Sequence, residues 1–213
     1  MDDKQPAPRR GRPRSETVRS AVLTAAAELA LRGGPAAATV EAIAKRAEVS
    51  RTTIYKWWPS AASIVLEGLY ERVRNSVTRP PGSNSVDAIT HHVKALFGFL
   101  ADPEVGPLLR NVIAASASDR AIEHALFEQW ITPRRGAIAA IVRDAVGNGE
   151  LPADTDVEVA VDALVSPPYY RLVFGMPTLD DASIDRLVQT VWQGCLGQVD
   201  QEPGLSELTT HIE

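Results

Sequence analysis

The sequence contains little of what several classes of protein need. It has one cysteine, Cys195, so no disulfide can form within the chain and a reducing cytoplasm is the expected compartment. No run of about 18 uninterrupted apolar residues occurs, although a membrane-spanning helix would require one. The segment MDDKQPAPRR at residues 1–10 also lacks the apolar stretch of a secretory signal. We therefore expect a cytoplasmic protein that is not inserted in a membrane.

Signals of catalysis are equally scarce. The histidines, which show no HExxH or related metal-ligand spacing, are His91, His92, His124 and His211. No Gly-rich phosphate-binding loop follows a predicted strand, and Cys195 lies among apolar residues, where a small buried side chain is favoured over a nucleophile. The sequence predicts a protein that is not an enzyme and has no catalytic residue, metal site or cofactor.

Sustained alternation of polar and apolar residues is also missing, so strands are not expected. Apolar residues instead recur at spacings of three and four, which predicts an all-α chain. Helices are expected over 15–33, after caps at Thr39 and Ser50, from 59–60 towards 79, over 85–100, 103–116 and 119–146 with a kink at Pro133, from Asp154 or Asp156 to 167–168, and from Asp181 onwards.

Charge is unevenly distributed on the two sides of a Pro-Pro-Gly linker at residues 80–82. Residues 1–80 contain 14 Lys+Arg against 8 Asp+Glu, a net charge of +6, whereas residues 81–213 contain 8 against 19, a net charge of −11. A basic N-terminal part joined to an acidic body is typical of a DNA-binding headpiece with a separate regulatory body. The alternative is a chance clustering of solvated charges.

The segment between Thr39 and Ser60 has the pattern of a helix-turn-helix. Apolar positions that would pack two helices, with the turn between residues 47 and 50, are Ile43, Ala44, Ala47, Val49 and Ile54. The second helix of such a unit lies in the major groove with its N-terminal residues towards the bases. Arg51 could then donate twice to guanine O6 and N7, and Tyr55 and Lys56 could reach the backbone.

Residues 39–65, TVEAIAKRAEVSRTTIYKWWPSAASIV, resemble the DNA-binding region of the TetR family of transcriptional regulators. The resemblance implies an all-helical homodimer with an N-terminal headpiece, joined by a long helix to a C-terminal bundle for ligand binding and dimerisation. The expected division is a basic arm (1–14), the headpiece (15–60), a regulatory body (61–201) and a tail (202–213). The implied partners are a double-stranded DNA operator, a second copy of the chain and a small, largely apolar effector.

Two positions depart from the family pattern. Glu48 stands where the pattern has the glycine of the turn, so it either adopts a positive φ at a cost of about 1 kcal/mol or the turn has another shape. Ala61 stands where a phosphate-binding lysine is common, which leaves the N-terminus of the following helix to bind phosphate.

Further DNA contacts are expected around this unit. The family pattern places Trp58 in the core, so Trp57 is expected at the DNA-facing rim, although both indoles could be structural. Arg10 and Arg12 belong to an Arg-Gly-Arg-Pro segment that resembles the AT-hook core, a minor-groove element; the alternative is a basic tail without base preference. The predicted DNA-binding residues are Arg10, Arg12, Thr39, Ser50, Arg51, Thr52, Thr53, Tyr55, Lys56, Trp57 and Ser60.

The body is expected to dimerise and to bind an effector. An almost wholly apolar segment from Val157 to Val165 and a striped last helix suggest a four-helix interface, formed by Val161, Leu164, Ile184, Leu187, Val188, Val191, Trp192 and Cys195. These residues could alternatively complete a monomer core. Candidate effector-binding residues, most of which could equally be core, are His92, Phe97, Leu100, Asn111, His124, Phe127, Trp130, Tyr169, Tyr170 and Phe174.

These observations favour a homodimeric repressor that leaves a palindromic operator when a small molecule binds. A ligand-independent regulator or an activator would carry the same headpiece. A helical small-molecule carrier is the alternative from another class; it would bind ligand and have no operator affinity.

Overall fold

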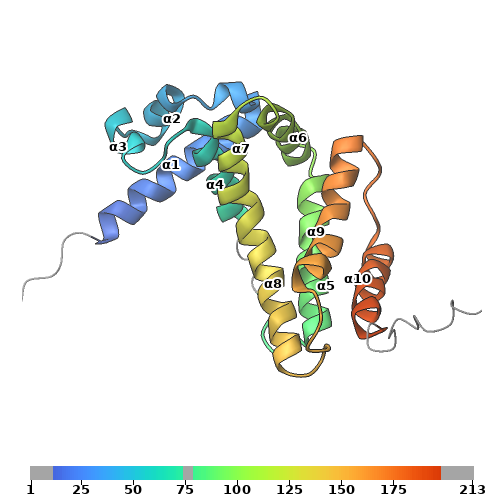
Figure 1. The fold of residues 1–213 in the computed structure, drawn as a ribbon. Helices are drawn as coiled ribbons and strands as arrows, with labels where there is room; N and C mark the ends of the chain where they lie inside the picture. The colour runs from blue at the N-terminus through green and yellow to red at the C-terminus, as the bar shows by residue number, and fades with distance from the viewer. Residues whose placement is uncertain (1–11, 74–78, 198–213) are drawn as a thin grey trace, which may run out of the picture. The chain divides into compact units, whose positions relative to one another are not determined.

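The computed structural model describes residues 12–73 and 79–197, and these ranges are helical without any strand (Figure 1). The helices are α1 (Arg12–Gly33), η1 (Pro35–Ala37), α2 (Val40–Ala47), α3 (Arg51–Tyr55), α4 (Ala61–Val73), α5 (Ser85–Ala101), α6 (Val105–Ser116), α7 (Arg120–Leu126), the π-helical turn η3 (Phe127–Ile131), α8 (Thr132–Gly147), α9 (Val157–Phe174) and α10 (Asp181–Leu196). The all-α prediction is confirmed for the described residues. None of their helices combines the length and apolar character that crossing a membrane requires.

Side-chain caps fix where several helices begin. Thr39 accepts a hydrogen bond from the backbone N–H of Ala42, and Ser50 accepts one from Thr53, each over 3.1 Å. Asp156 does the same at the start of α9. Each cap satisfies an N–H group that the first turn of a helix leaves without an intrahelical partner. The predicted caps at Thr39 and Ser50 are confirmed, and Asp156 rather than Asp154 caps α9.

The long helix predicted over residues 119–146 is interrupted where Pro133 disturbs it. Proline has no N–H to donate to the preceding turn. The turn before it widens into η3, where the N–H of Thr132 bonds to the carbonyl of Phe127, five residues back. The helix therefore continues as α8 after a π-helical turn.

Helix α9 continues through Pro167 and Pro168, although the sequence suggested that the helix only reaches them. Buried side chains on both sides, Leu164 before the prolines and Leu172 after them, hold the helix against its neighbours. This packing offsets the hydrogen bonds that two prolines remove. The helix ends at Gly175, whose φ of 65° is the left-handed conformation of a C-terminal cap.

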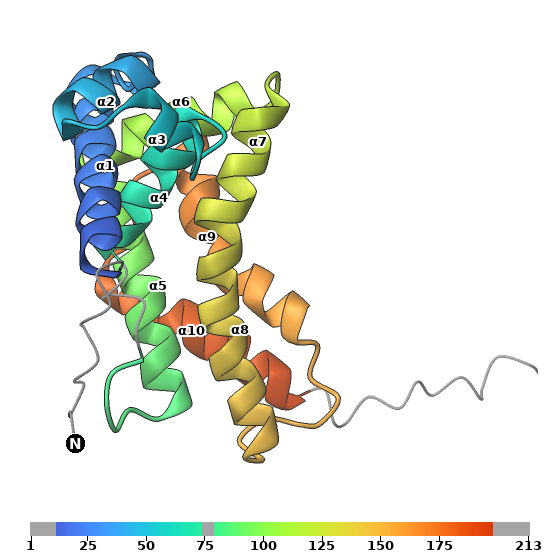
Figure 2. The ribbon, with the colours of Figure 1, turned by 90° about the vertical axis from the view of Figure 1, so that its left-hand side faces the viewer.

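The chain divides into two compact units that interleave along the sequence. Of the described residues, the first contains 12–73 and 102–133, and the second contains 79–101 and 134–197. Within the first, α1 packs against α2 and α4, and α2 packs against α3 (Figure 2). Residues 61–73 and 102–133 therefore group with the headpiece rather than with the remainder of the predicted body.

In the second unit α5 packs against both α9 and α10, which also contact each other. Ile89 and Val93 of α5 are buried, as is Val161 of α9. Ion pairs lie around this core: Lys94 on α5 with Asp185 on α10, 2.7 Å apart, and Arg135 on α8 with Glu158 on α9, 2.6 Å apart. The bond to Asp185 raises the pKa of Lys94.

Candidate DNA-binding surface

The short helix α3 is held by its buried residues and presents the others to solvent. Ile54 is completely buried and Trp58, just beyond the helix, is 4% exposed. Five residues are too few to form a stable helix in water, so this packing rather than local propensity maintains α3. The predicted core position of Trp58 agrees with its burial.

Most of the predicted contact residues of α3 lie together on the solvent side. Arg51, Thr52 and Lys56 are exposed, and Tyr55 is 58% exposed; Thr53 is half-buried. This surface combines a guanidinium, an ammonium, a phenol and a hydroxyl, which are the groups that donate to phosphates and base edges. An exposed tyrosine and two cations next to a fully buried isoleucine make α3 a helix with one packed face and one polar face.

Trp57 and Trp58 divide as their positions on the helix predicted. Their rings meet edge to face with centroids 5.5 Å apart, but Trp57 is 39% exposed. The indole N–H of Trp58 donates to Glu67 on α4, and Glu67 also accepts from Arg19 on α1. One half-buried carboxylate, that of Glu67, thus connects the segment just after α3 to the longer helices α4 and α1. Glu67 was missed by the sequence reasoning because nothing in the pattern joins residues on three different helices.

Three hydroxyls predicted to contact DNA are used in helix caps. The side-chain oxygens of Thr39 and Ser50 accept backbone N–H groups, and Ser50 Oγ lies 2.8 Å from Oγ1 of Thr53. Ser60 accepts from the N–H of Ser63, whose hydroxyl in turn accepts from the N–H of Ser60, a reciprocal arrangement like a capping box. The structure therefore gives these three hydroxyls a role in fixing where α2, α3 and α4 begin.

The turn between α2 and α3 uses Glu48 in the left-handed conformation. Its φ is 56° and its ψ is 39°, and its N–H donates to the carbonyl of Ala44. Of the non-glycine residues described, Glu48 alone has a positive φ. The turn therefore keeps the shape that favours glycine, and Glu48 adopts it at a cost of about 1 kcal/mol.

An ion pair joins α2 to the start of α3. Nη1 of Arg51 donates to Oε1 of Glu41 over 3.0 Å. A hydrogen bond from the backbone of Glu41 itself, followed by the bond from Arg51, holds the pKa of Glu41 below its usual range. Sequence reasoning missed Glu41, because it lies ten positions from Arg51 on another helix.

The N-terminal arm falls largely outside the described residues. Arg12 is the first residue of α1, and Arg10 lies outside the described ranges. The minor-groove hypothesis for the Arg-Gly-Arg-Pro segment stays a prediction.

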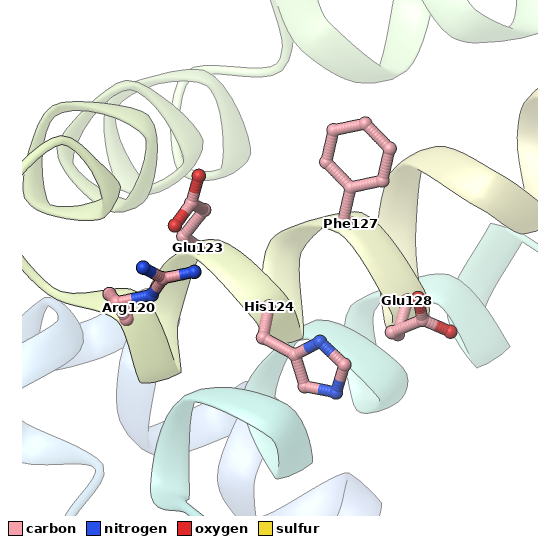
Figure 3. A pocket seen from close by; sticks show the side chains of 5 residues that line it. All are labelled: Arg120, Glu123, His124, Phe127 and Glu128. Carbon is pink, nitrogen blue, oxygen red and sulfur yellow. The ribbon is translucent and has the colours of Figure 1, made fainter.

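The predicted effector-binding residues do not form one group. Buried ones are His92, Phe97, Leu100 and Trp130, and exposed ones are Asn111, His124, Phe127, Tyr170 and Phe174, with Tyr169 half-buried. Two pairs of them lie close together. The rings of Tyr170 and Phe174 are 4.9 Å apart on α9, and His124 and Phe127 both line a hollow of about 410 Å³ that is also lined by Arg120, Glu123 and Glu128. These five residues follow one another on a single stretch of α7 and η3, and Phe127 points away from His124 (Figure 3). This open strip differs from the enclosed apolar pocket that a small effector would fill.

Half of the predicted dimer residues are interior to a single chain, and for these the prediction is wrong. Val161 is completely buried, and Leu164, Ile184 and Val188 are at most 2% exposed, because α5, α9 and α10 pack on one another. Leu187, Val191, Trp192 and Cys195 are half-buried and remain accessible along α10.

The outward face of α9 is apolar instead. It comprises Val159, Ala163, Ser166, Tyr170, Val173 and Phe174, all exposed, of which only Ser166 is polar; successive members are three or four positions apart, except for the adjacent Val173 and Phe174. Val159 is 63% exposed and Phe174 68% exposed, and the Phe174 ring lies 4.9 Å from that of Tyr170. Contiguous exposed apolar residues on a helix mark an interaction site.

Two family models match the chain. Residues 22–67 match the model of bacterial regulatory proteins of the tetR family, and residues 80–191 match that of the tetracyclin repressor-like C-terminal domain. The first match contains the helix-turn-helix, and the second contains α9.

Relatives of similar length carry the same assignment. The chain is 32% identical to the HTH-type transcriptional regulator YdeS of Bacillus subtilis, over 87% of this chain and 93% of that protein. It is 30% identical to the DNA-binding transcriptional repressor TetR of Mycobacteroides abscessus, over 84% and 93%. The crystal structure of the TetR family transcription regulator SCO0332 superposes with a TM-score of 0.74 at 32% identity, over 83% of this chain and 97% of that one.

Proposed function

Because the chain belongs to the TetR family of DNA-binding transcriptional regulators, we propose that it is a homodimeric repressor that binds a palindromic operator and is released by a small, largely apolar ligand. The headpiece (15–60) contacts the operator, and the body (61–201) binds the partner chain and the ligand. A ligand that binds one of two conformations of the protein more tightly shifts the population towards that conformation. If that conformation binds the operator weakly, operator affinity falls by at most the difference in ligand-binding free energy between the two conformations.

One observation carries the DNA-binding part of the proposal. Helix α3 buries Ile54 while it exposes Arg51, Thr52 and Tyr55, and Lys56, which caps its C-terminal end, is exposed as well. A recognition helix needs this arrangement, because its packed face sets the orientation in the groove and its N-terminal side chains meet the bases. In the proposal Arg51 contacts a base, whereas Tyr55 and Lys56 contact the phosphate backbone.

The outward face of α9 supports the dimer. In this proposal the face formed by residues 159–174 packs on its copy in a second chain, together with the accessible side of α10. Ala163 and Ser166 are small and lie at the middle of the face, so two α9 helices can approach closely there. A two-fold dimer places two recognition helices about one DNA turn apart, which accounts for a palindromic operator.

Substitution of Arg51 by alanine tests the DNA-binding proposal. A fragment that the wild-type protein selects from a random-sequence library is expected to bind about a thousandfold more tightly than scrambled DNA at moderate salt. Arg51→Ala should abolish most of this preference and retain salt-dependent binding to any sequence. Fluorescence anisotropy measures both affinities.

A matched change at another exposed arginine provides the control. Arg110 is exposed on α6, outside the helix-turn-helix, so Arg110→Ala should keep the full preference. A wild-type protein that binds all fragments equally would contradict the proposal.

Substitution of Ala163 by glutamate tests the dimer. Ala163 is exposed in the single chain, so the change should leave each chain folded, but it places two like charges at the centre of the proposed interface. Sedimentation at micromolar concentration is expected to show a dimer for the wild-type protein and a monomer for Ala163→Glu. Ala140→Glu, on the exposed side of α8, is the control and should stay dimeric. A monomeric wild-type protein would refute the dimer.

A further inference from the structure

The exposed ion pair between Glu41 and Arg51 lies on the surface that the proposed function assigns to DNA. Glu41 is the second residue of α2 and Arg51 the first of α3, and their side chains are 62% and 63% exposed. Exposed pairs of this kind add little to fold stability. Because the pair adds little stability, the effect of Glu41 that matters for DNA binding is its effect on the Arg51 side chain.

A carboxylate beside Arg51 has two physical effects on DNA binding. It repels phosphates, which disfavours every DNA sequence equally. It also holds the guanidinium by Nη1, and so removes rotamers that a long side chain would otherwise sample before binding. A guanidinium has five N–H donors, so a bond to Glu41 through Nη1 leaves further donors for DNA.

Guanine is the partner that benefits from such an arrangement. Its O6 and N7 in the major groove accept two parallel hydrogen bonds, which requires an oriented planar donor. A phosphate has no such requirement, and it competes with the nearby carboxylate for the same donors. The pair therefore favours a base contact over a backbone contact for Arg51.

We propose that Glu41 is a positioning residue that holds Arg51 for a guanine of the bound DNA and disfavours contact of Arg51 with phosphates. The inference rests on the proposed function, because it requires a sequence-specific DNA site. Glu41 acts through Arg51 and does not itself contact the base.

The test measures base discrimination on the DNA fragment that the full-length wild-type protein selects. Each base pair of the fragment is replaced in turn, and affinities are measured by anisotropy. For the wild-type protein, replacing one particular G·C pair in each half-site should lower the affinity about tenfold or more. This loss of affinity, the guanine penalty, should vanish in Arg51→Ala. In Glu41→Ala the penalty at that pair should fall to about threefold or less, and affinity for scrambled DNA should rise.

A double substitution separates positioning from direct contact. If Glu41 acts through Arg51, then adding Glu41→Ala to Arg51→Ala changes no base penalty. A penalty that changes in the double variant would mean that Glu41 contacts a base itself, which overturns the inference. An unchanged guanine penalty in the single variant Glu41→Ala would overturn it as well.

The pair of Arg46 with Glu28 provides a matched control. It is also an exposed ion pair in the headpiece, with side chains 44% and 36% exposed, but it joins α2 to α1 and involves no residue of α3. Glu28→Ala removes one negative charge, as Glu41→Ala does, and should leave the guanine penalty unchanged. Loss of the penalty in both variants would show a general charge effect and overturn the inference.

Failure of the inference and failure of the proposed function give different results. If the wild-type protein selects no sequence, both are refuted. If it selects a sequence whose base penalties do not depend on Arg51, sequence-specific binding stands and the role of Glu41 is refuted.

Discussion

Replacement of Gly68 by alanine is expected to lower the free energy of unfolding by about 1 to 3 kcal/mol, although alanine is the better helix former. Gly68 lies inside α4 where it crosses α1. A Cβ atom at this position would stand 2.5 Å from the backbone oxygen of Leu23 and 3.4 Å from Cβ of Ala27. A backbone oxygen cannot swing aside as the end of a flexible side chain would, so the two helices have to separate.

Gly98 offers a matched control, because it lies inside α5 with no atom within 4 Å of an added Cβ. Gly98→Ala should raise stability by about 0.5 to 1 kcal/mol through helix propensity alone. Urea denaturation of the three proteins at one protein concentration measures both effects. If Gly68→Ala proved as stable as Gly98→Ala, the close crossing of α1 and α4 would be refuted.

Truncation of Ile54 to alanine is the second change with a large expected effect, a loss of about 2 to 5 kcal/mol. Ile54 is completely buried, and α3 has too few residues to persist without packing. The variant should therefore lose both stability and DNA binding, because the exposed side chains of α3 are no longer held in place.

The adjacent residue separates stability from binding. Tyr55 is 58% exposed, so Tyr55→Ala should change stability by less than about 0.5 kcal/mol. Under the proposed function it still weakens DNA binding, because its phenol contacts the backbone. Thermal unfolding and anisotropy on the same samples distinguish the two. Equal stability losses for Ile54→Ala and Tyr55→Ala would contradict the burial pattern of α3.

Local features of the fold could be predicted from the sequence because their causes are local. A side-chain oxygen three residues before a free N–H makes a cap, which is why Thr39 and Ser50 were recognised. Pro133 cannot donate a hydrogen bond, so a disturbance of the long helix was expected and η3 is found there. The division between Trp57 and Trp58 followed from the resemblance and from the 100° between successive residues of a helix.

Features that depend on tertiary packing could not be predicted in this way. Helix α9 is apolar on almost every side, so periodicity gives no indication of which face meets α5 and which meets solvent. Val161 and Leu164 were therefore assigned to the wrong face. The effector-binding residues share this difficulty, because buried Phe97 and exposed Phe174 belong to the same residue type, and only packing distinguishes them.

The candidate site shows the same limit. The helix-turn-helix pattern identified Arg51 and its neighbours, whereas Glu41 and Glu67 bond to residues on other helices and carry no signal in the sequence. Glu41 accepts from Arg51, and Glu67 from Trp58 and Arg19. Both are acidic residues in an N-terminal part, residues 1–80, that its net positive charge characterised, so a charge count gave no reason to consider them.

Because Glu48 adopts the left-handed conformation, its replacement by glycine is expected to compensate for destabilising substitutions elsewhere in the headpiece. Its side chain is exposed, so glycine there removes the backbone strain without leaving a cavity. Glu48→Gly should therefore raise the free energy of unfolding by about 1 kcal/mol. It should do so in any destabilised headpiece variant whose own substitution is far enough from residue 48 for the two effects to add. A genetic screen for restored DNA binding in destabilised headpiece variants would therefore recover substitutions at codon 48, and variants too unstable to purify could be studied in that background.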